Sequence, residues 1–75
     1  MIKYLLFTTP TCPNCLPAKE YLTEKGIDFE VIDATEDLIN RAKYRIMSAP
    51  TLLILEGNKI LNRCVGIDSI KSEIK

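Results

Sequence analysis

Two stretches of the chain are apolar on both faces of an extended backbone. The first runs from Ile2 to Thr8 and the second from Thr51 to Leu55. Strands that are covered on both sides lose the alternation of apolar and polar residues that half-exposed strands show. We therefore expect both stretches to lie in the middle of a sheet.

Two further strands are expected, over Asp28 to Ile32 and over Lys59 to Val65. The second of these alternates more strongly, which is typical of an edge strand. Gly57-Asn58 directly precedes it and has the composition of a two-residue hairpin turn. The last two strands of the chain are therefore expected to form an antiparallel hairpin.

The first of three expected helices starts at Pro13 or Asn14 and runs to Lys25, where Gly26 is a natural stop. Pro17 lies near its beginning and lacks the N–H that a helix interior needs. We expect a distorted first turn at this residue.

The second and third helices follow from capping residues and apolar stripes. Asp33 or Thr35 is expected to cap the second, which runs to about Tyr44, and Asp68 or Ser69 to cap the third. Positions expected to be buried follow the spacing of one helix face: Leu38, Ile39 and Ala42 in the second helix, and Ile67, Ile70 and Ile74 in the third. Both helices should cover the sheet with these stripes.

The order of elements is β-α-β-α-β-β-α, which places the chain in the α/β class. Two parallel strands joined by a helical crossover and then an antiparallel hairpin give a four-stranded mixed sheet with helices on both faces. With 75 residues and no repeats or linkers, we expect one domain covering residues 1–75.

Composition narrows the function classes. Ten basic and ten acidic residues cancel, which argues against nucleic acid or a membrane surface as a partner. The apolar run near the start is too short for a secretory signal, and no stretch is long enough to span a membrane. Three cysteines, an odd number, suit a reducing cytoplasm. We expect a cytoplasmic monomer.

Cys12-Pro13-Asn14-Cys15 lies between the first strand and the first helix. A helix N-terminus carries unpaired N–H groups and a partial positive charge, both of which favour a thiolate. The spacing of three residues brings the second sulfur within disulfide reach. This arrangement predicts a dithiol redox site, with Cys12 exposed as the nucleophile and Cys15 sheltered.

Other interpretations of the cysteines are weaker. A zinc site needs two more ligands, but the chain has no histidine and one further cysteine, Cys64. Copper and heavy-metal carriers also use Cys-x-x-Cys, usually with a preceding methionine and a β-α-β-β-α-β order. Strand alternation groups Cys64 with Ile60 and Asn62 on one face. Cys64 itself is expected to act as a small buried hydrophobic residue, with a regulatory or resolving role as the alternative.

A second motif, Ser48-Ala49-Pro50-Thr51, opens the third strand. A Cys-x-x-Cys before the first helix together with x-Pro-Thr before a later strand resembles the thioredoxin fold. The resemblance covers nearly the whole chain, without the extra N-terminal strand and helix of full thioredoxins. It implies a cis bond before Pro50, lying against the two thiols, and a backbone at Ala49 that can pair with a substrate.

The chain resembles small glutaredoxin-like proteins that behave as miniature thioredoxins. Pro10 to Cys15 is typical of glutaredoxins, whereas Ala42 to Leu53, Gly57 and Val65-Gly66 are closer to thioredoxins. Glutaredoxins commonly carry a cation at the position of Thr9 and Tyr or Phe at Asn14. Thioredoxins carry a buried aspartate at Leu6.

The resemblance implies a thiol–disulfide oxidoreductase that acts on protein disulfides. Such an enzyme needs no cofactor beyond an external electron source, which is either a thioredoxin-reductase-like flavoprotein or glutathione. The departure from the glutaredoxin pattern at Thr9 favours the flavoprotein. Residues expected to contact the substrate flank the thiols in three segments: Thr11, Pro13, Asn14, Ala49, Pro50, Thr51 and Gly66. A carrier of metal or of an iron–sulfur cluster, and a structural subunit without turnover, remain the alternatives.

Overall fold

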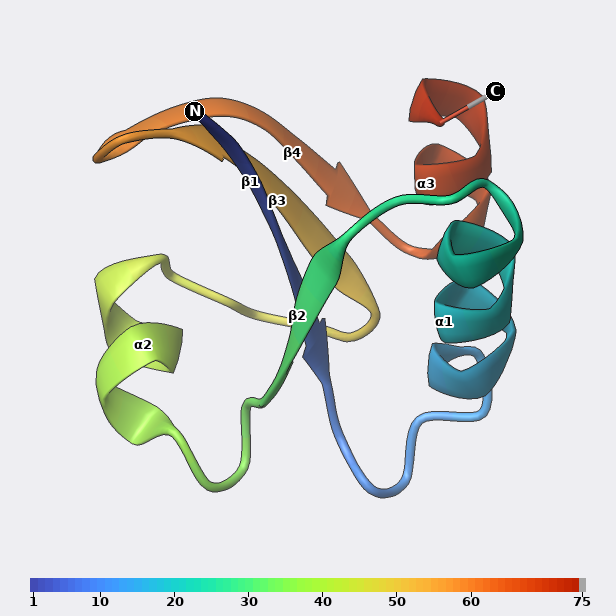
Figure 1. The fold of residues 1–75 in the computed structure, drawn as a ribbon. Coiled ribbons are helices and arrows are strands. Elements are labelled where there is room, and N and C mark those ends of the chain that lie inside the picture. The colour runs from blue at the N-terminus through green and yellow to red at the C-terminus, as the bar shows by residue number, and fades with distance from the viewer. Residues whose placement is uncertain (75) are drawn as a thin grey trace.

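A computed structural model describes residues 1–74 and has one mixed sheet with three helices (Figure 1). The elements follow the chain in the order β1 (Ile2–Thr8), α1 (Cys15–Glu24), β2 (Phe29–Asp33), α2 (Leu38–Lys43), β3 (Thr51–Glu56), β4 (Lys59–Val65) and α3 (Ile67–Glu73). The expected order of strands and helices is confirmed.

The strands lie side by side in the order β2-β1-β3-β4. β1 pairs in parallel with β2 and antiparallel with β3, which in turn pairs antiparallel with β4. The two strands expected in the middle of the sheet are therefore its two central strands. Their runs of buried residues follow from having a helical layer on each side.

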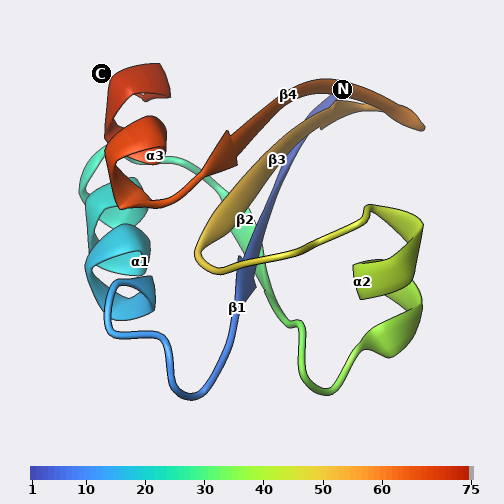
Figure 2. The same ribbon diagram turned by 180° about the vertical axis from the view of Figure 1, so that it is seen from behind.

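Helices α1 and α3 cover one face of the sheet, and α2 lies on the other (Figures 1 and 2). Each face has its own apolar cluster of buried residues. The cluster under α1 and α3 consists of Leu6, Ala18, Leu22, Leu52, Ile54, Cys64 and Ile70. The cluster on the α2 side consists of Leu5, Phe7, Ala34, Ile46, Leu53 and Leu55.

Helix α2 does not bury the stripe expected from its sequence. Leu38 is 60% exposed and Ile39 is 82% exposed, and no residue of α2 is buried. Residues that flank the helix cover the sheet instead. Ala34 and Ile46 are buried there, so the apolar side chains of α2 itself remain at the surface.

The ends of α2 explain this displacement. Tyr44, just beyond the helix, packs edge-on against the Phe7 ring with 6.0 Å between the centroids. The cap is Asp37, whose carboxylate accepts from the Asn40 amide. Asp33, expected as a cap, instead accepts from the backbone N–H and the hydroxyl of Thr35. The Asp33–Thr35 turn delays the start of the helix and shortens it to six residues.

The β3–β4 hairpin forms as expected, with Glu56 paired to Lys59 across the Gly57-Asn58 turn. An irregularity in β4 shifts the register: Leu55 pairs with Ile60, whereas Ile54 pairs with Asn62. The extra residue in β4 moves Ile60 to the face opposite Cys64. The strict alternation of the sequence had grouped the two together, so that grouping is wrong.

Helix α3 begins at Ile67, two residues earlier than a cap at Asp68 allows. Gly66 is the N-cap, and Asp68 lies in the first turn without a capping bond. Ile70 is buried, as expected, whereas Ile67 and Ile74 are half-buried. No helix within residues 1–74 has the length and apolar character that crossing a membrane requires.

Leu22→Ala should lower the free energy of unfolding by about 3 kcal/mol, because this side chain is fully buried under α1. Leu38→Ala should change it by less than about 0.5 kcal/mol, because Leu38 stays largely in solvent. Urea denaturation followed by circular dichroism measures both. Equal losses for the two variants would contradict the different packing of α1 and α2.

Candidate active site

The loop from β1 to α1 holds the first cysteine just outside the helix. The backbone N–H of Cys12 donates to the Thr9 carbonyl at 3.2 Å, and that of Cys15 donates to the Cys12 carbonyl at 3.5 Å. Asn14 is the N-cap, and the N–H of Ala18 donates to its carbonyl at 3.1 Å. The start of α1 therefore falls between the two cysteines, with Cys12 outside the helix and Cys15 as its first residue.

Pro17 does not disturb the helix as expected. α1 begins at Cys15, later than Pro13 or Asn14, so Pro17 is its third residue. The first four N–H groups of a helix have no partner within the helix, and a proline among them removes no hydrogen bond. The late start removes the reason for expecting a distorted turn.

The two thiols have different surroundings. Cys12 is half-buried, Cys15 is only 4% exposed, and both are free. Burial raises the pKa of Cys15 from its ordinary value near 9.0 to about 11, and a hydrogen bond with the Cys12 thiol acts in the same direction. A backbone hydrogen bond from Thr9 and the charge of Lys19 oppose this rise in pKa. Cys15 is therefore sheltered and protonated at neutral pH.

The loop into β3 lies at the same end of the sheet as the cysteines. The peptide bond between Ala49 and Pro50 is cis, as expected. Pro50 is fully buried, and Thr51 is 1% exposed with its hydroxyl donating to the Ser48 carbonyl at 2.8 Å. Thr51 pairs with Phe7, so β3 begins beside the last residues of β1 before the cysteine loop.

The third expected segment joins this loop through the backbone. Val65, at the end of β4, pairs with Thr51 on the side of β3 that faces away from β1. The N–H of Gly66 donates to the Pro50 carbonyl at 2.8 Å. Gly66 adopts a φ of 87°, which suits a residue without a side chain. The sheet therefore fixes residues 49–51 and Gly66 to one another and places them beside the end of β1.

The remaining expected residues, Thr11, Pro13 and Asn14, are exposed around Cys12. A hollow of about 160 Å³ connects the cysteine loop with the loop into β3. Its wall contains Thr11, which was expected there, and residues that sequence reasoning missed: Thr9, Ala34, Thr35, Arg41, Ile46, Met47 and Ser48. The signal for Met47, which is 88% exposed, was its position directly before Ser48-Ala49-Pro50.

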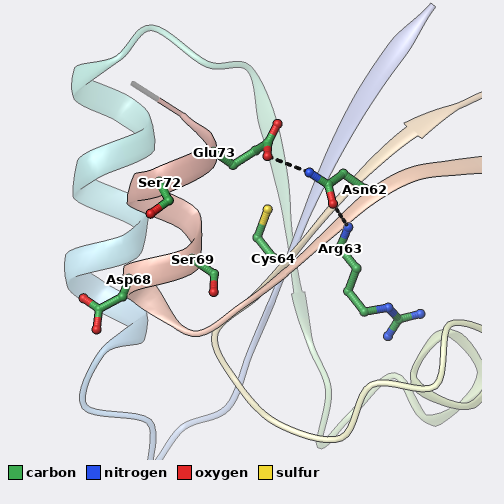
Figure 3. A pocket seen from close by; sticks show the side chains of 7 residues that line it. All are labelled: Asn62, Arg63, Cys64, Asp68, Ser69, Ser72 and Glu73. Carbon is green, nitrogen blue, oxygen red and sulfur yellow. Dashed lines mark hydrogen bonds between the residues drawn. The ribbon is translucent and has the colours of Figure 1, made fainter.

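Cys64 lies in β4, on the face of the sheet that α1 and α3 cover, and is 4% exposed (Figure 3). Burial raises its pKa, and the charge of Glu73 acts in the same direction. Cys64 pairs with Leu52 and belongs to the apolar cluster under α1 and α3. Its expected burial as a small hydrophobic residue is confirmed. Within residues 1–74 no three or more potential ligands among His, Cys, Asp and Glu come together as a metal site.

The family model for glutaredoxin matches residues 5–59, more than half of the chain. The chain belongs to the glutaredoxin family. It is 38% identical over 64 residues to an uncharacterized glutaredoxin-like 8.6 kDa protein in a rubredoxin operon of Clostridium pasteurianum, covering 81% of this chain and 83% of that protein. The family has a thiol-oxidoreductase type of fold.

Thioredoxin-like proteins are also similar. A prophage-derived thioredoxin-like protein, YosR of Bacillus subtilis, is 32% identical over 72 residues, covering 84% of this chain and 90% of its own. The structure of thioredoxin-2 from the malaria parasite matches 99% of this chain and 78% of its own with a TM-score of 0.84 at 19% identity. The expected thioredoxin-like fold is thus confirmed for this glutaredoxin-family chain.

In the reduced protein, iodoacetamide should alkylate Cys12 well before Cys15 at pH 7, because Cys15 is buried and protonated. The rate at Cys15 should rise about tenfold per pH unit until pH approaches 11, where its thiol ionises. Peptide mapping by mass spectrometry across pH 7 to 10 measures the rate at each site. Faster labelling of Cys15 than of Cys12 at pH 7 would reverse the assignment.

Proposed function

We propose that this chain is a dithiol–disulfide oxidoreductase for protein substrates, with Cys12 as nucleophile and Cys15 as resolving thiol. The observation that carries the proposal is the unequal burial of two adjacent thiols at the start of α1. Membership of the glutaredoxin family supports redox chemistry at this pair. The odd number of cysteines supports a cytoplasmic location.

The reaction begins with the Cys12 thiolate attacking one sulfur of a substrate disulfide. The substrate S–S bond breaks, a mixed disulfide with Cys12 forms, and the other substrate sulfur leaves as a thiolate that takes up a proton. Cys15 then loses its proton and attacks the Cys12 sulfur. The mixed disulfide breaks, the second substrate sulfur leaves as a thiolate that takes up this proton, and the protein keeps the Cys12–Cys15 disulfide.

Two electrons thus pass from the dithiol to the substrate, and an external two-electron donor restores the dithiol. The high pKa of Cys15 suits this order of events. A protonated Cys15 does not compete for the incoming disulfide, and its attack is confined to a sulfur already held beside it.

Substrate binding is assigned to the residues around the thiols. Thr11, Pro13 and Asn14 present exposed surface next to Cys12. The backbone of Ala49, beside buried Pro50, is proposed to pair with an extended substrate segment, as in strand addition. Thr51 and Gly66 support that loop, the first through Ser48 and the second through the Pro50 carbonyl.

Cys12→Ser should abolish insulin reduction with dithiothreitol as electron source, because the attacking sulfur is lost. Cys15→Ser should accumulate a mixed disulfide with the substrate, visible as a mass adduct that dithiothreitol removes. Cys64→Ala is the matched control and should retain turnover, since Cys64 lies in the apolar cluster under α3. Loss of activity in Cys64→Ala as large as in Cys12→Ser would refute the assigned roles.

A thioredoxin-reductase-like flavoprotein should reduce the Cys12–Cys15 disulfide faster than glutathione does at cellular concentrations. Thr9 stands where glutaredoxins commonly carry a cation for glutathione, and a lost charged hydrogen bond costs about 1.5–3 kcal/mol, tenfold or more in affinity. Arg41 lines the same hollow as Thr9, but its Nε is bound to the Ile46 carbonyl. Stopped-flow reduction of the disulfide form compares the two donors.

The matched variant Thr9→Lys should raise the glutathione-dependent rate about tenfold and leave the flavoprotein-dependent rate unchanged. Thr23→Lys, on an exposed position of α1, controls for added charge and should alter neither rate. Faster reduction of the wild type by glutathione would assign this chain to the glutathione-dependent glutaredoxins.

A further inference from the structure

The outer side of α2 carries an apolar surface bordered by cations. A hollow of about 500 Å³ lies there, lined by Leu38, Arg41, Ala42, Arg45, Ile46 and Met47. Together with the adjacent Ile39 these residues are named the α2 surface. Its large apolar side chains, Leu38, Ile39 and Met47, are 60%, 82% and 88% exposed. Such clusters of exposed apolar residues commonly mark interaction sites.

Charge on the α2 surface has one sign. Residues 38–47 contain Arg41, Lys43 and Arg45 and no acidic residue. The ion pair found among residues 1–74 joins Lys3 to Glu30, elsewhere on the molecule. Arg63 adds a further cation nearby, because its guanidinium donates to the carbonyls of Tyr44 and Arg45. The complementary occupant is therefore acidic as well as apolar.

The α2 surface is continuous with the candidate active site. The hollow beside the cysteine loop and the hollow over α2 share Arg41, Ile46 and Met47. The first of them reaches Thr11, directly before Cys12. A polypeptide bound at the thiols can therefore extend past Met47 and onto α2 without leaving the surface of the protein.

We propose that the α2 surface docks an acidic, apolar segment of the disulfide-bearing partner protein. This inference rests on the proposed function and adds substrate selectivity to it. Leu38 and Met47 cover apolar side chains of the segment, and Arg45 attracts its carboxylates. Disulfides flanked by acidic and apolar residues are then reduced in preference to disulfides flanked by basic residues.

The test uses three peptides joined by the same disulfide to a fluorescence quencher. Their tails alternate leucine with glutamate, with serine or with lysine. Single-turnover reduction by excess reduced protein gives a second-order rate constant for each. The glutamate tail should react about tenfold faster than the lysine tail at low salt, and the difference should shrink as salt increases.

Arg45→Asn removes one cation at a residue with φ of 53°, a conformation that asparagine tolerates. It should lower the rate with the glutamate tail about threefold and leave the serine tail unchanged. Leu38→Gln should slow all three tails by a similar factor, about threefold, because each tail carries leucine. Lys25→Asn and Val31→Thr, on exposed positions away from α2, are the matched controls. They should leave the rates with all three tails unchanged.

Equal rates with all three tails in the wild type would overturn this inference while leaving the proposed function intact. Absence of reduction with every tail would overturn the proposed function and this inference with it. Sedimentation velocity identifies another occupant: a wild-type dimer that Leu38→Gln dissociates would assign the α2 surface to a second copy of the chain and overturn the inference.

Discussion

The pairing of β3 with both of its neighbours is the constraint on which the candidate active site depends. Thr51 faces Phe7 on one side and Val65 on the other. Phe7 leads into the cysteine loop, Thr51 follows Pro50, and Val65 precedes Gly66. One set of paired residues across three strands thus brings together three segments that are far apart in the sequence. The hydrogen bond between Gly66 and Pro50 joins two of these segments directly.

Burial on the α1 side of the sheet gives the two thiols different surroundings. Ala18 and Leu22 anchor α1 in the apolar cluster, which draws the first turn and Cys15 inward. Cys12 lies before the helix and keeps contact with solvent. The difference between the two sulfurs therefore comes from where the helix begins. A third cysteine in the same chain, Cys64, has a raised pKa for the same reason, desolvation, without a neighbouring thiol to react with.

Much of this arrangement could be predicted from the sequence, because it depends on local patterns. The runs Ile2 to Thr8 and Thr51 to Leu55 specify central strands, and Cys12 with Cys15 specify a dithiol at a helix start. Family resemblance supplied the cis bond before Pro50. These features do not depend on how distant parts of the chain compete for the same space.

The features that could not be predicted depend on such competition. The stripe on α2 has helical spacing, but Tyr44, Ala34 and Ile46 already cover that face of the sheet. The irregularity in β4 leaves the apolar pattern unchanged and changes only which face each residue takes. Pro17 was misread because its effect depends on whether the helix starts two residues earlier or later.

Helix α2 contributes none of its own residues to the interior. Substitutions on its outer side therefore change the surface chemistry at almost no cost in folding free energy. Over evolutionary time this helix can diversify freely, whereas residues beneath α1 are held by packing. The exposed side of one short helix can thus change in sequence while the packing around Cys15 stays fixed.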